Sequence, residues 1–185
     1  KGLVELATGM EGHPDNVAPA ILGGFVVSVM EGKRVDTVRE EVPPEDLAFA
    51  LFIPDFPLST VAAREALPKQ VEHHDAVYNL SRVSMLTAAF LKRDYERLEV
   101  ATGDRLHQPY RLPLIAHAEE IFQMAKECGA YTSTISGAGS SLLSILPKER
   151  EKSFAKAARE WMGQRHLTGW RLVMLGIDNE GVRVV

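Results

Sequence analysis

Residues 11–17 of this 185-residue chain hold the side chains best suited to chemistry. His13, Asp15 and Asn16 follow one another closely, and an apolar run begins directly after them. Pro14 suits the first turn of a helix, where its missing N–H costs nothing, and an acidic residue in that turn faces the positive end of the helix dipole. We therefore expect a helix that begins at Pro14 and presents the three polar side chains at its mouth. A helix cap without a catalytic function would explain the same pattern equally well.

Two arginines far apart in the sequence form a second candidate site. Arg64 lies four residues after Thr60, so the two side chains share one face of a short helix. Arg111 ends the segment Gln-Pro-Tyr-Arg, just before another expected helix. The planar fork of arginine matches a carboxylate, so two arginines brought together by the fold would suit the carboxylate of an amino acid. The alternatives are a capping role for Thr60 and surface ion pairs for the arginines.

A third candidate is the segment Ser136-Gly-Ala-Gly-Ser-Ser141, which lies between two expected strands and is rich in small residues. It is neither a Walker loop nor a complete G-x-G-x-x-G motif, so a tight β-turn would explain it by itself. Glu5 lies eight residues before His13 on an expected helix. Taken alone, it is most simply interpreted as a glutamate that faces solvent.

Four motifs, in this order, resemble the GHMP kinase superfamily and, within it, the homoserine kinase family. They are His13-Pro-Asp-Asn-Val17, Ser59-Thr-Val-Ala-Ala-Arg64, Asp104-Arg-Leu-His-Gln-Pro-Tyr-Arg111 and Ser136-Gly-Ala-Gly-Ser-Ser141. The resemblance runs from Glu5 to about Gly176. It implies an enzyme of threonine biosynthesis that transfers the γ-phosphoryl group of ATP to the hydroxyl of L-homoserine, with Mg²⁺ beside the triphosphate.

The resemblance also implies a role for each candidate residue. Glu5 would hold Mg²⁺, and one carboxylate is enough because this ion keeps several waters and takes phosphate oxygens as further ligands. His13, Asp15 and Asn16 would lie against the amino acid and its reacting hydroxyl. The other substrate contacts would come from Thr60, Arg64, Arg111, Gly137 and Gly139. The nucleotide would be contacted by Ser136 and Ala138, and the Arg111 side chain would be positioned by His107 and Gln108.

The candidate catalytic residues are Asn16 and Asp15. Asn16 stands where some GHMP relatives, such as mevalonate kinase, carry an aspartate base, and an amide cannot act as a general base. Phosphoryl transfer depends mainly on alignment and on cations, because its transition state is loose. We therefore expect Asn16 to orient the hydroxyl while the proton leaves late, to the γ-phosphate itself. Asp15 is the competing candidate for a base.

Apolar spacing and turn-forming residues predict the elements that hold these motifs. A helix over residues 1–7, with Leu3, Leu6 and Ala7 on its apolar face, precedes the polar cluster, and a β-hairpin over residues 25–42 follows it. From Leu47 onward the expected order is strand, helices, strand, strand, helix, strand, which is ferredoxin-like with inserted helices. The fold class is therefore α+β. Two of the expected helices are one over residues 71–91, with an apolar face of Val77, Leu80, Val83, Leu86 and Phe90, and one that begins at Pro113.

A boundary is expected at residues 42–46, where two prolines and two acids interrupt regular structure. The resemblance then implies that residues 1–45 end an N-terminal nucleotide- and Mg²⁺-binding domain of the ribosomal protein S5 domain 2-like type, and that residues 46–185 are the GHMP kinase C-terminal domain. The superfamily binds ATP through a P-x-x-x-G-L-G-S-S loop, and the sequence contains none. We therefore expect a fragment of a kinase with little or no kinase activity by itself. Its exposed sheet edges would favour self-association, such as a homodimer.

Composition narrows the class of protein further. The net charge is −4 and both signs are scattered, so nucleic acid is not an expected partner. The longest apolar run, residues 20–30, is too short to span a bilayer, so a membrane is not an expected partner either. The single cysteine, Cys128, fits a reducing compartment, and we expect the cytoplasm. Two alternatives stay open at this point: another GHMP kinase that acts on a different small alcohol, and a non-catalytic ferredoxin-like module that binds an amino acid.

Overall fold

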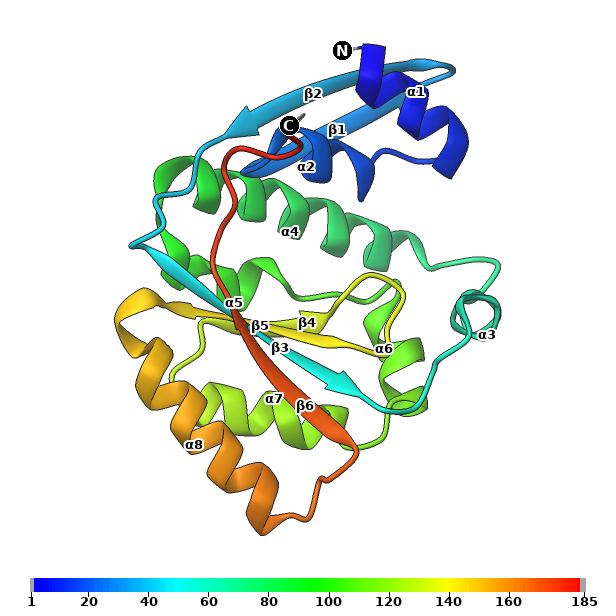
Figure 1. Ribbon diagram of the computed structural model, residues 1–185. Coiled ribbons are helices and arrows are strands. Elements are labelled where there is room, and N and C mark those ends of the chain that lie inside the picture. Colours follow the sequence, from blue (N-terminus) through cyan, green and yellow to red (C-terminus); the bar gives the residue numbers. More distant parts are fainter. Residues whose placement is uncertain (1, 184–185) are drawn as a thin grey trace. The chain divides into compact units, whose positions relative to one another are not determined.

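The computed structural model describes residues 2–183, which form two compact units. Unit 1 contains residues 2–44 and 177–183, and unit 2 contains residues 45–176 (Figure 1). The first junction falls at the expected break. The second junction follows Gly176, so residues 177–183 lie in unit 1, whereas the predicted C-terminal domain extends over residues 46–185. Among the described residues, the helices are too short or too polar to cross a membrane.

Unit 1 pairs two helices with a β-hairpin. The hairpin confirms the prediction and pairs Phe25 with Glu40 at one end and Glu31 with Arg34 at the other. Gly32 forms its tip with a φ of 61°, a conformation that glycine adopts without steric cost. The four elements are α1 (Gly2–Glu11), α2 (Val17–Leu22), β1 (Phe25–Glu31) and β2 (Arg34–Glu40).

Two details of the helices in unit 1 differ from the prediction. In α1 the side chains of Val4 and Thr8 are buried, whereas Leu3 and Leu6 are 55% and 65% exposed. The apolar spacing of Leu3, Leu6 and Ala7 therefore did not identify the buried face. Helix α2 begins at Val17 rather than Pro14, so the polar cluster lies in the turn that precedes the helix.

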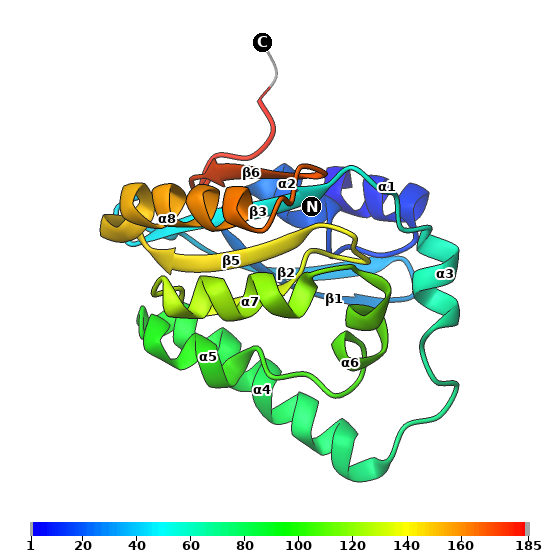
Figure 2. The same cartoon turned by 90° about the horizontal axis from the view of Figure 1, so that it is seen from below.

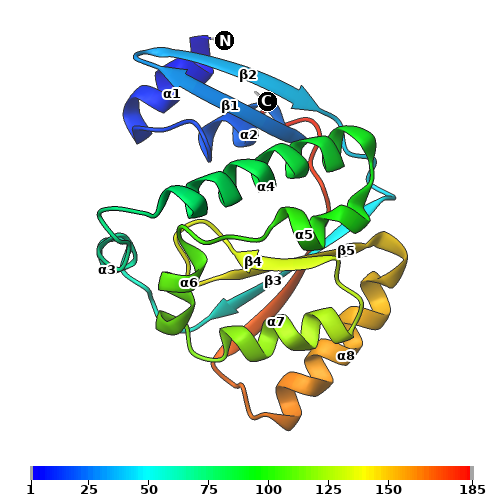
Figure 3. The same ribbon diagram turned by 180° about the vertical axis from the view of Figure 1, so that it is seen from behind.

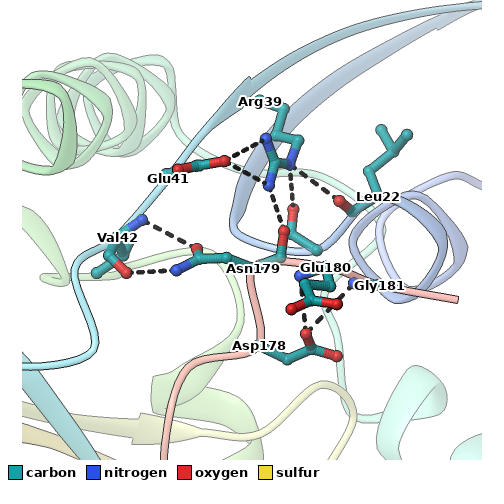
Figure 4. A network of polar contacts seen from close by, with 9 residues as sticks. Leu22, Arg39, Glu41, Val42, Asp178, Asn179, Glu180 and Gly181 are labelled. Carbon is teal, nitrogen blue, oxygen red and sulfur yellow. Dashed lines mark hydrogen bonds and ion pairs between the residues drawn. The ribbon is translucent and has the colours of Figure 1, made fainter. Parts of the chain in front are cut away.

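The last described residues complete unit 1 through the polar network of Figure 4. Asn179 brackets the backbone of Val42: its Oδ1 accepts from the Val42 N–H at 3.1 Å, and its Nδ2 donates to the Val42 carbonyl at 2.7 Å. Arg39 donates to the carbonyls of Leu22, at 2.9 Å, and of Asn179. A Cβ on Gly23 would lie 2.5 Å from the Asn179 carbonyl carbon, so this close approach requires glycine. These contacts explain why the end of the chain belongs with its beginning.

Unit 2 has the expected ferredoxin-like arrangement, and the α+β prediction is confirmed. Its sheet has the order β4-β5-β3-β6, and each neighbouring pair is antiparallel. The strands are β3 (Leu47–Pro54), β4 (Thr132–Ile135), β5 (Leu142–Pro147) and β6 (Trp170–Leu175). The helices are α3 (Thr60–Glu65), α4 (His73–Lys92), α5 (Leu98–Ala101), α6 (Gln108–Arg111), α7 (Ala118–Glu127) and α8 (Glu151–Gln164), with short 3₁₀ turns at Tyr95–Arg97, Leu112–Leu114 and Lys148–Arg150.

The main core of unit 2 lies between this sheet and helices α7 and α8, which lie side by side across one face (Figure 2). Ala48, Ala50 and Phe52 alternate along β3 and are fully buried. Phe52 meets Phe154 of α8 edge-to-face, with ring centroids 6.5 Å apart. Figure 3 shows α4 and α5 next to β4.

Two helix predictions in unit 2 need correction. Helix α4 has the expected length, but Val77, Leu80 and Val83 are 50%, 68% and 59% exposed, and the buried residues Ala89 and Phe90 lie at its C-terminal end. The apolar stripe therefore does not mark a buried face over most of the helix. The helix expected from Pro113 is divided into a 3₁₀ turn and α7, which begins at Ala118 after a left-handed residue at 117.

Candidate functional site

In unit 1, the polar turn before α2 is organised around Asp15. Oδ1 of this carboxylate contacts Nδ1 of His13 and accepts the backbone N–H of Asn16 at 3.0 Å. The side chains of His13 and Asp15 are 42% and 71% exposed, and Asn16 is exposed as well. Asn16 occupies the N-cap position of α2, but its side chain makes no capping hydrogen bond. The side chains of this turn are therefore accessible from solvent and do not act as a helix cap.

Glu5 lines a cavity of about 700 Å³ in unit 1. The same cavity is lined by Thr8, one helical turn further along α1, and by Lys33 of the hairpin. Thr8 is 3% exposed, and its Oγ1 is buried without a hydrogen-bond partner among the described residues. The carboxylate of Glu5 beside the cavity is an oxygen ligand of the kind that Mg²⁺ prefers, whereas the Thr8 hydroxyl is buried. No group of three or more acidic, histidine or cysteine side chains suited to a metal occurs within residues 2–183.

In unit 2, Arg111 connects three segments that are distant in sequence. It is 9% exposed. Its Nε donates to the carbonyl of Ala63 in α3 at 2.9 Å, and its Nη1 approaches the carbonyl of Gly137 at 3.5 Å. Nη1 also lies 3.4 Å from Nδ1 of His107. Arg111 is therefore a buried contact between α6, α3 and the loop over residues 136–141, and not a surface ion pair.

The other predicted residues of unit 2 lie around Arg111. Arg64 directly follows Ala63 and is exposed. Ser59 caps α3 through its Oγ, which accepts the N–H of Val61 at 3.2 Å, and Thr60 is the first residue of the helix. Figure 3 shows α3, α6 and the β4–β5 loop at the same end of unit 2. The fold thus brings the two arginine motifs and the glycine-rich motif together.

The loop over residues 136–141 closes on itself. The Ser136 N–H donates to the backbone carbonyl of Ser141 at 2.9 Å, and the Gly139 N–H donates to the backbone carbonyl of Ser136 at 3.0 Å. Gly137 and Gly139 have φ values of 57° and 93°. A Cβ on Gly139 would lie 3.1 Å from Ile115 Cδ1 and 3.2 Å from Leu58 Cδ2, whereas a Cβ on Gly137 would meet open space. Among the described residues, the N–H groups of Gly137 and Ala138 have no hydrogen-bond partner, so they are free to bind an anion.

The segment before Arg111 is held by Asp104. Its carboxylate accepts the backbone N–H groups of Leu106, at 2.8 Å, of His107, at 3.1 Å, and of Gln108. Burial raises the pKa of Asp104, but the hydrogen bonds from Gln108, from Asn79 and from Leu106 lower it more, and the net pKa is below its usual value. The pKa of His107 is below its usual value, mainly because the residue is buried. The negative charge of Asp104 raises this pKa and the positive charge of Arg111 lowers it.

Gln108 links this segment to the sheet, because its Oε1 accepts the N–H of Ile135 at the end of β4 at 2.9 Å. The prediction that His107 and Gln108 position the arginine motif agrees with these contacts. Thr8 lies outside the sequence motifs, and Asp104 begins one of them without a predicted role of its own. Asp104 could have been found as an acceptor that precedes the Gln-Pro start of a helix by four residues. No sequence signal marked Thr8, because its burial depends on the packing of α1.

Comparison with known proteins gives one family model and a set of similar proteins. Residues 86–164 match the family model described as GHMP kinases C terminal. The homoserine kinase of Caldicellulosiruptor bescii is 41% identical over 182 residues, which are 98% of this chain and 59% of that protein. The homoserine kinase of Moorella thermoacetica is 49% identical over 150 residues, 81% of this chain and 50% of that protein.

Solved structures of homoserine kinases are also similar to this chain. The crystal structure of homoserine kinase from Cytophaga hutchinsonii superimposes with a TM-score of 0.83 at 28% identity, and covers 96% of this chain and 56% of its own. Mevalonate kinase from L. major, with a TM-score of 0.60 and 13% identity, shares the fold alone. The chain spans about three fifths of the length of the curated relatives that it matches. The chain is therefore similar to homoserine kinases along nearly its whole length, and its residues 86–164 match the C-terminal model of the GHMP kinases.

Proposed function

We propose that the whole protein is a homoserine kinase, which transfers the γ-phosphoryl group of ATP to the hydroxyl of L-homoserine. One observation supports this proposal most directly: Arg111 of α6 is buried against the carbonyl of Ala63 in α3. The next residue of α3 is a second arginine, Arg64. The exposed Arg64 can offer two parallel N–H donors to a substrate carboxylate. The Nε and Nη1 groups of Arg111 already contact backbone carbonyls, so Arg111 would contribute its remaining N–H groups and its charge. Thr60, on the same helix as Arg64, would add a further contact to the amino acid.

Within this proposal, the loop over residues 136–141 contacts the nucleotide and the substrate through its backbone. The free N–H groups of Gly137 and Ala138 would bind an anionic oxygen, and the open space beside Gly137 leaves room for it. Ser136 and Gly139 would hold the loop in the required conformation through the hydrogen bonds that close it. Backbone donors of this kind are suited to phosphate oxygens because they are fixed before the ligand binds.

In unit 1, Glu5, which lines the cavity, would hold Mg²⁺. When bound, the ion would neutralise charge on the triphosphate. The exposed turn before α2 would contact the homoserine hydroxyl. Asn16 would orient it, and His13 would be held by the carboxylate of Asp15. Alignment by such contacts can lower a barrier by about 7–11 kcal/mol, which exceeds the contribution of a general base.

The whole protein should be tested with ATP and a panel of L-homoserine, L-serine, mevalonate and galactose. We expect phosphorylation of L-homoserine at the highest kcat/KM. In the Arg64→Lys variant the KM for L-homoserine should rise about tenfold, equivalent to about 1.4 kcal/mol, while the KM for ATP stays within about twofold. Arg165→Lys is the matched control, because this exposed arginine pairs with Glu120 on the surface.

An equal rise of both KM values in Arg64→Lys would contradict carboxylate recognition by Arg64. A preference for mevalonate or galactose would assign the protein to another GHMP kinase. Saturable binding of L-homoserine without any turnover of ATP by the whole protein would favour the non-catalytic module.

A further inference from the structure

Asn79 of α4 reaches across to the segment that leads into α6, and both ends of its amide are engaged there. Its Nδ2 donates to Asp104 Oδ1 at 2.7 Å, and its Oδ1 accepts the backbone N–H of Arg105 at 2.9 Å. Asn79 is half-buried. An amide used at both ends fixes the direction of the partner chain as well as its distance, because a donor and an acceptor must be matched at once.

Asp104, which Asn79 holds, in turn binds the residues before Arg111. One carboxylate accepts three consecutive backbone N–H groups, those of Leu106, His107 and Gln108, in addition to the amide of Asn79. Hydrogen bonds to an ionised carboxylate are shorter and stronger than those between neutral groups. The start of α6 is therefore held by a single anionic acceptor, whose remaining contact is the donor from α4.

Neighbouring residues of α4 hold the same segment from the side. The ring of Tyr78 lies between two guanidinium groups, with Arg82 3.6 Å and Arg105 4.0 Å from its centroid. Arg105 also pairs with Asp75 of α4 at 3.1 Å. A Cβ on Gly103 would lie 2.6 Å from the Tyr78 hydroxyl, so the glycine permits this close approach. Several side chains of α4 thus contact residues 103–105, and Asn79 makes the two hydrogen bonds that fix their orientation.

The segment over residues 104–108 also affects the positions of the 136–141 loop and of Arg111. Gln108 holds the end of β4 through the N–H of Ile135, immediately before the loop over residues 136–141. Arg111 follows one turn later and contacts the carbonyls of Ala63 and Gly137. A rotation of residues 104–108 would therefore change the direction of the Arg111 guanidinium relative to α3 and to the loop.

We propose that Asn79 is a positioning residue for amino-acid recognition: through Asp104 it sets the orientation of α6, and thereby of Arg111 against Ala63 and the 136–141 loop. The inference rests on the proposed function, since Arg111 is taken to recognise the substrate carboxylate. Asn79 itself touches neither substrate nor nucleotide in this account.

The test compares Asn79→Leu, which keeps the size of the side chain and removes both hydrogen bonds, with Ser84→Ala on the same helix. Ser84 is exposed and its hydroxyl donates to the Leu80 carbonyl within α4, which makes it a matched control. In the whole kinase, Asn79→Leu should raise the KM for L-homoserine about tenfold or more, with kcat and the KM for ATP within about threefold. Ser84→Ala should change none of the three.

A second readout does not depend on catalysis. Hydrogen exchange of this chain should be faster in Asn79→Leu at the amides of Leu106, His107 and Gln108, and unchanged in β3 and α8. If the whole wild-type protein does not phosphorylate L-homoserine, the proposed function fails, and the exchange at these amides then decides the structural part of the inference by itself.

Because Asn79→Leu could also unfold α4, an exchange of the two partners provides a second variant set. Asn79→Asp places two carboxylates against each other and should raise the KM for L-homoserine. Adding Asp104→Asn removes the repulsion between the two carboxylates but also removes one acceptor for the backbone N–H groups, so the loss in the double variant should be smaller than the sum of the two single losses, which a double-mutant cycle measures. An unchanged KM in Asn79→Leu, an equal rise of both KM values, or strictly additive effects in the cycle would each overturn the proposal.

Discussion

Asp15 and Asn16 are neighbours in one exposed turn, yet their chemistry separates them. Asp15 is already engaged by His13 and by the N–H of Asn16, so its carboxylate organises the turn. The Asn16 amide makes no cap contact to α2 and is free to orient a hydroxyl. On this basis we expect the orienting amide to matter for the chemical step even though it cannot accept a proton.

In the whole protein, on the proposed function, Asn16→Ala should lower kcat by more than about tenfold, because the loss of alignment affects the transition state. Asp15→Asn should have a smaller effect on kcat, below the hundredfold that the loss of a general base typically produces. Steady-state kinetics at saturating ATP and L-homoserine measure both values. The reverse result, with a large loss for Asp15→Asn and less than a tenfold loss for Asn16→Ala, would transfer the main catalytic role to Asp15.

At the scale of elements, the stability of unit 2 depends on links between helices and the sheet as well as on its apolar core. Tyr95, in the 3₁₀ turn before α5, is 7% exposed and donates its hydroxyl to Asp46 at the start of β3, at 3.1 Å. Its ring also meets Phe90 of α4, with centroids 5.8 Å apart. One side chain therefore connects α4, α5 and the first strand of the sheet.

This link predicts a loss of stability at high pH. Burial, the hydrogen bond to Asp46 and its negative charge raise the pKa of Tyr95 to about 12, against Arg93, which lowers it. Because the folded pKa exceeds the unfolded value of about 10, the stabilisation is complete below pH 10 and is lost as pH rises toward 12. In Tyr95→Phe, the decline of the unfolding free energy over this pH range should be shallower.

Tyrosine absorbance during an alkaline titration gives an independent check. The wild-type chain should show late ionisation from Tyr95 and from Tyr131, whose pKa burial also raises, and Tyr95→Phe should lack one of these late groups. If Tyr95→Phe keeps the full late amplitude, the assignment is wrong.

At the scale of the whole molecule, the chain returns to its first unit after completing its second. Asn179 satisfies both backbone groups of Val42, a residue that is 1% exposed. Arg39 and the glycine pair before β1 add contacts to the same segment. Unit 1 therefore consists of two stretches of sequence separated by more than a hundred residues, and its stability depends on both.

Asn179→Ala should destabilise unit 1 by about 1–3 kcal/mol, because it leaves the buried N–H and carbonyl of Val42 without partners. Hydrogen exchange should become faster at residues 22–24 and 39–42 and stay unchanged in the sheet of unit 2. Glu180→Ala is the control, because its side chain is exposed and its backbone contact to Asp178 remains. An equal increase of hydrogen exchange in both units would show that this segment stabilises the whole chain and not unit 1 alone.

The sequence by itself determined the order of the elements, the fold class and the motifs of the family, because these depend on local spacing: the apolar run of β3, the hairpin over residues 25–42, and Ser59 before α3. It also indicated that Gln108 positions the arginine motif. It could not determine which apolar side chains are buried, and Leu6 and Leu80 stayed exposed although their spacing suggested a core. Periodicity identifies a face of a helix, but not whether another element covers it.

The tertiary structure decided the contacts between residues that are distant in sequence. Arg111 lies against Ala63, Asn79 engages Asp104, and Asn179 binds the backbone of Val42. Each of these contacts joins polar groups that local sequence would leave to solvent, and each becomes favourable when packing removes water and fixes the partner. The candidate residues are therefore readable from their types and motifs, whereas their orientation depends on long-range hydrogen bonds that exist once the chain is folded.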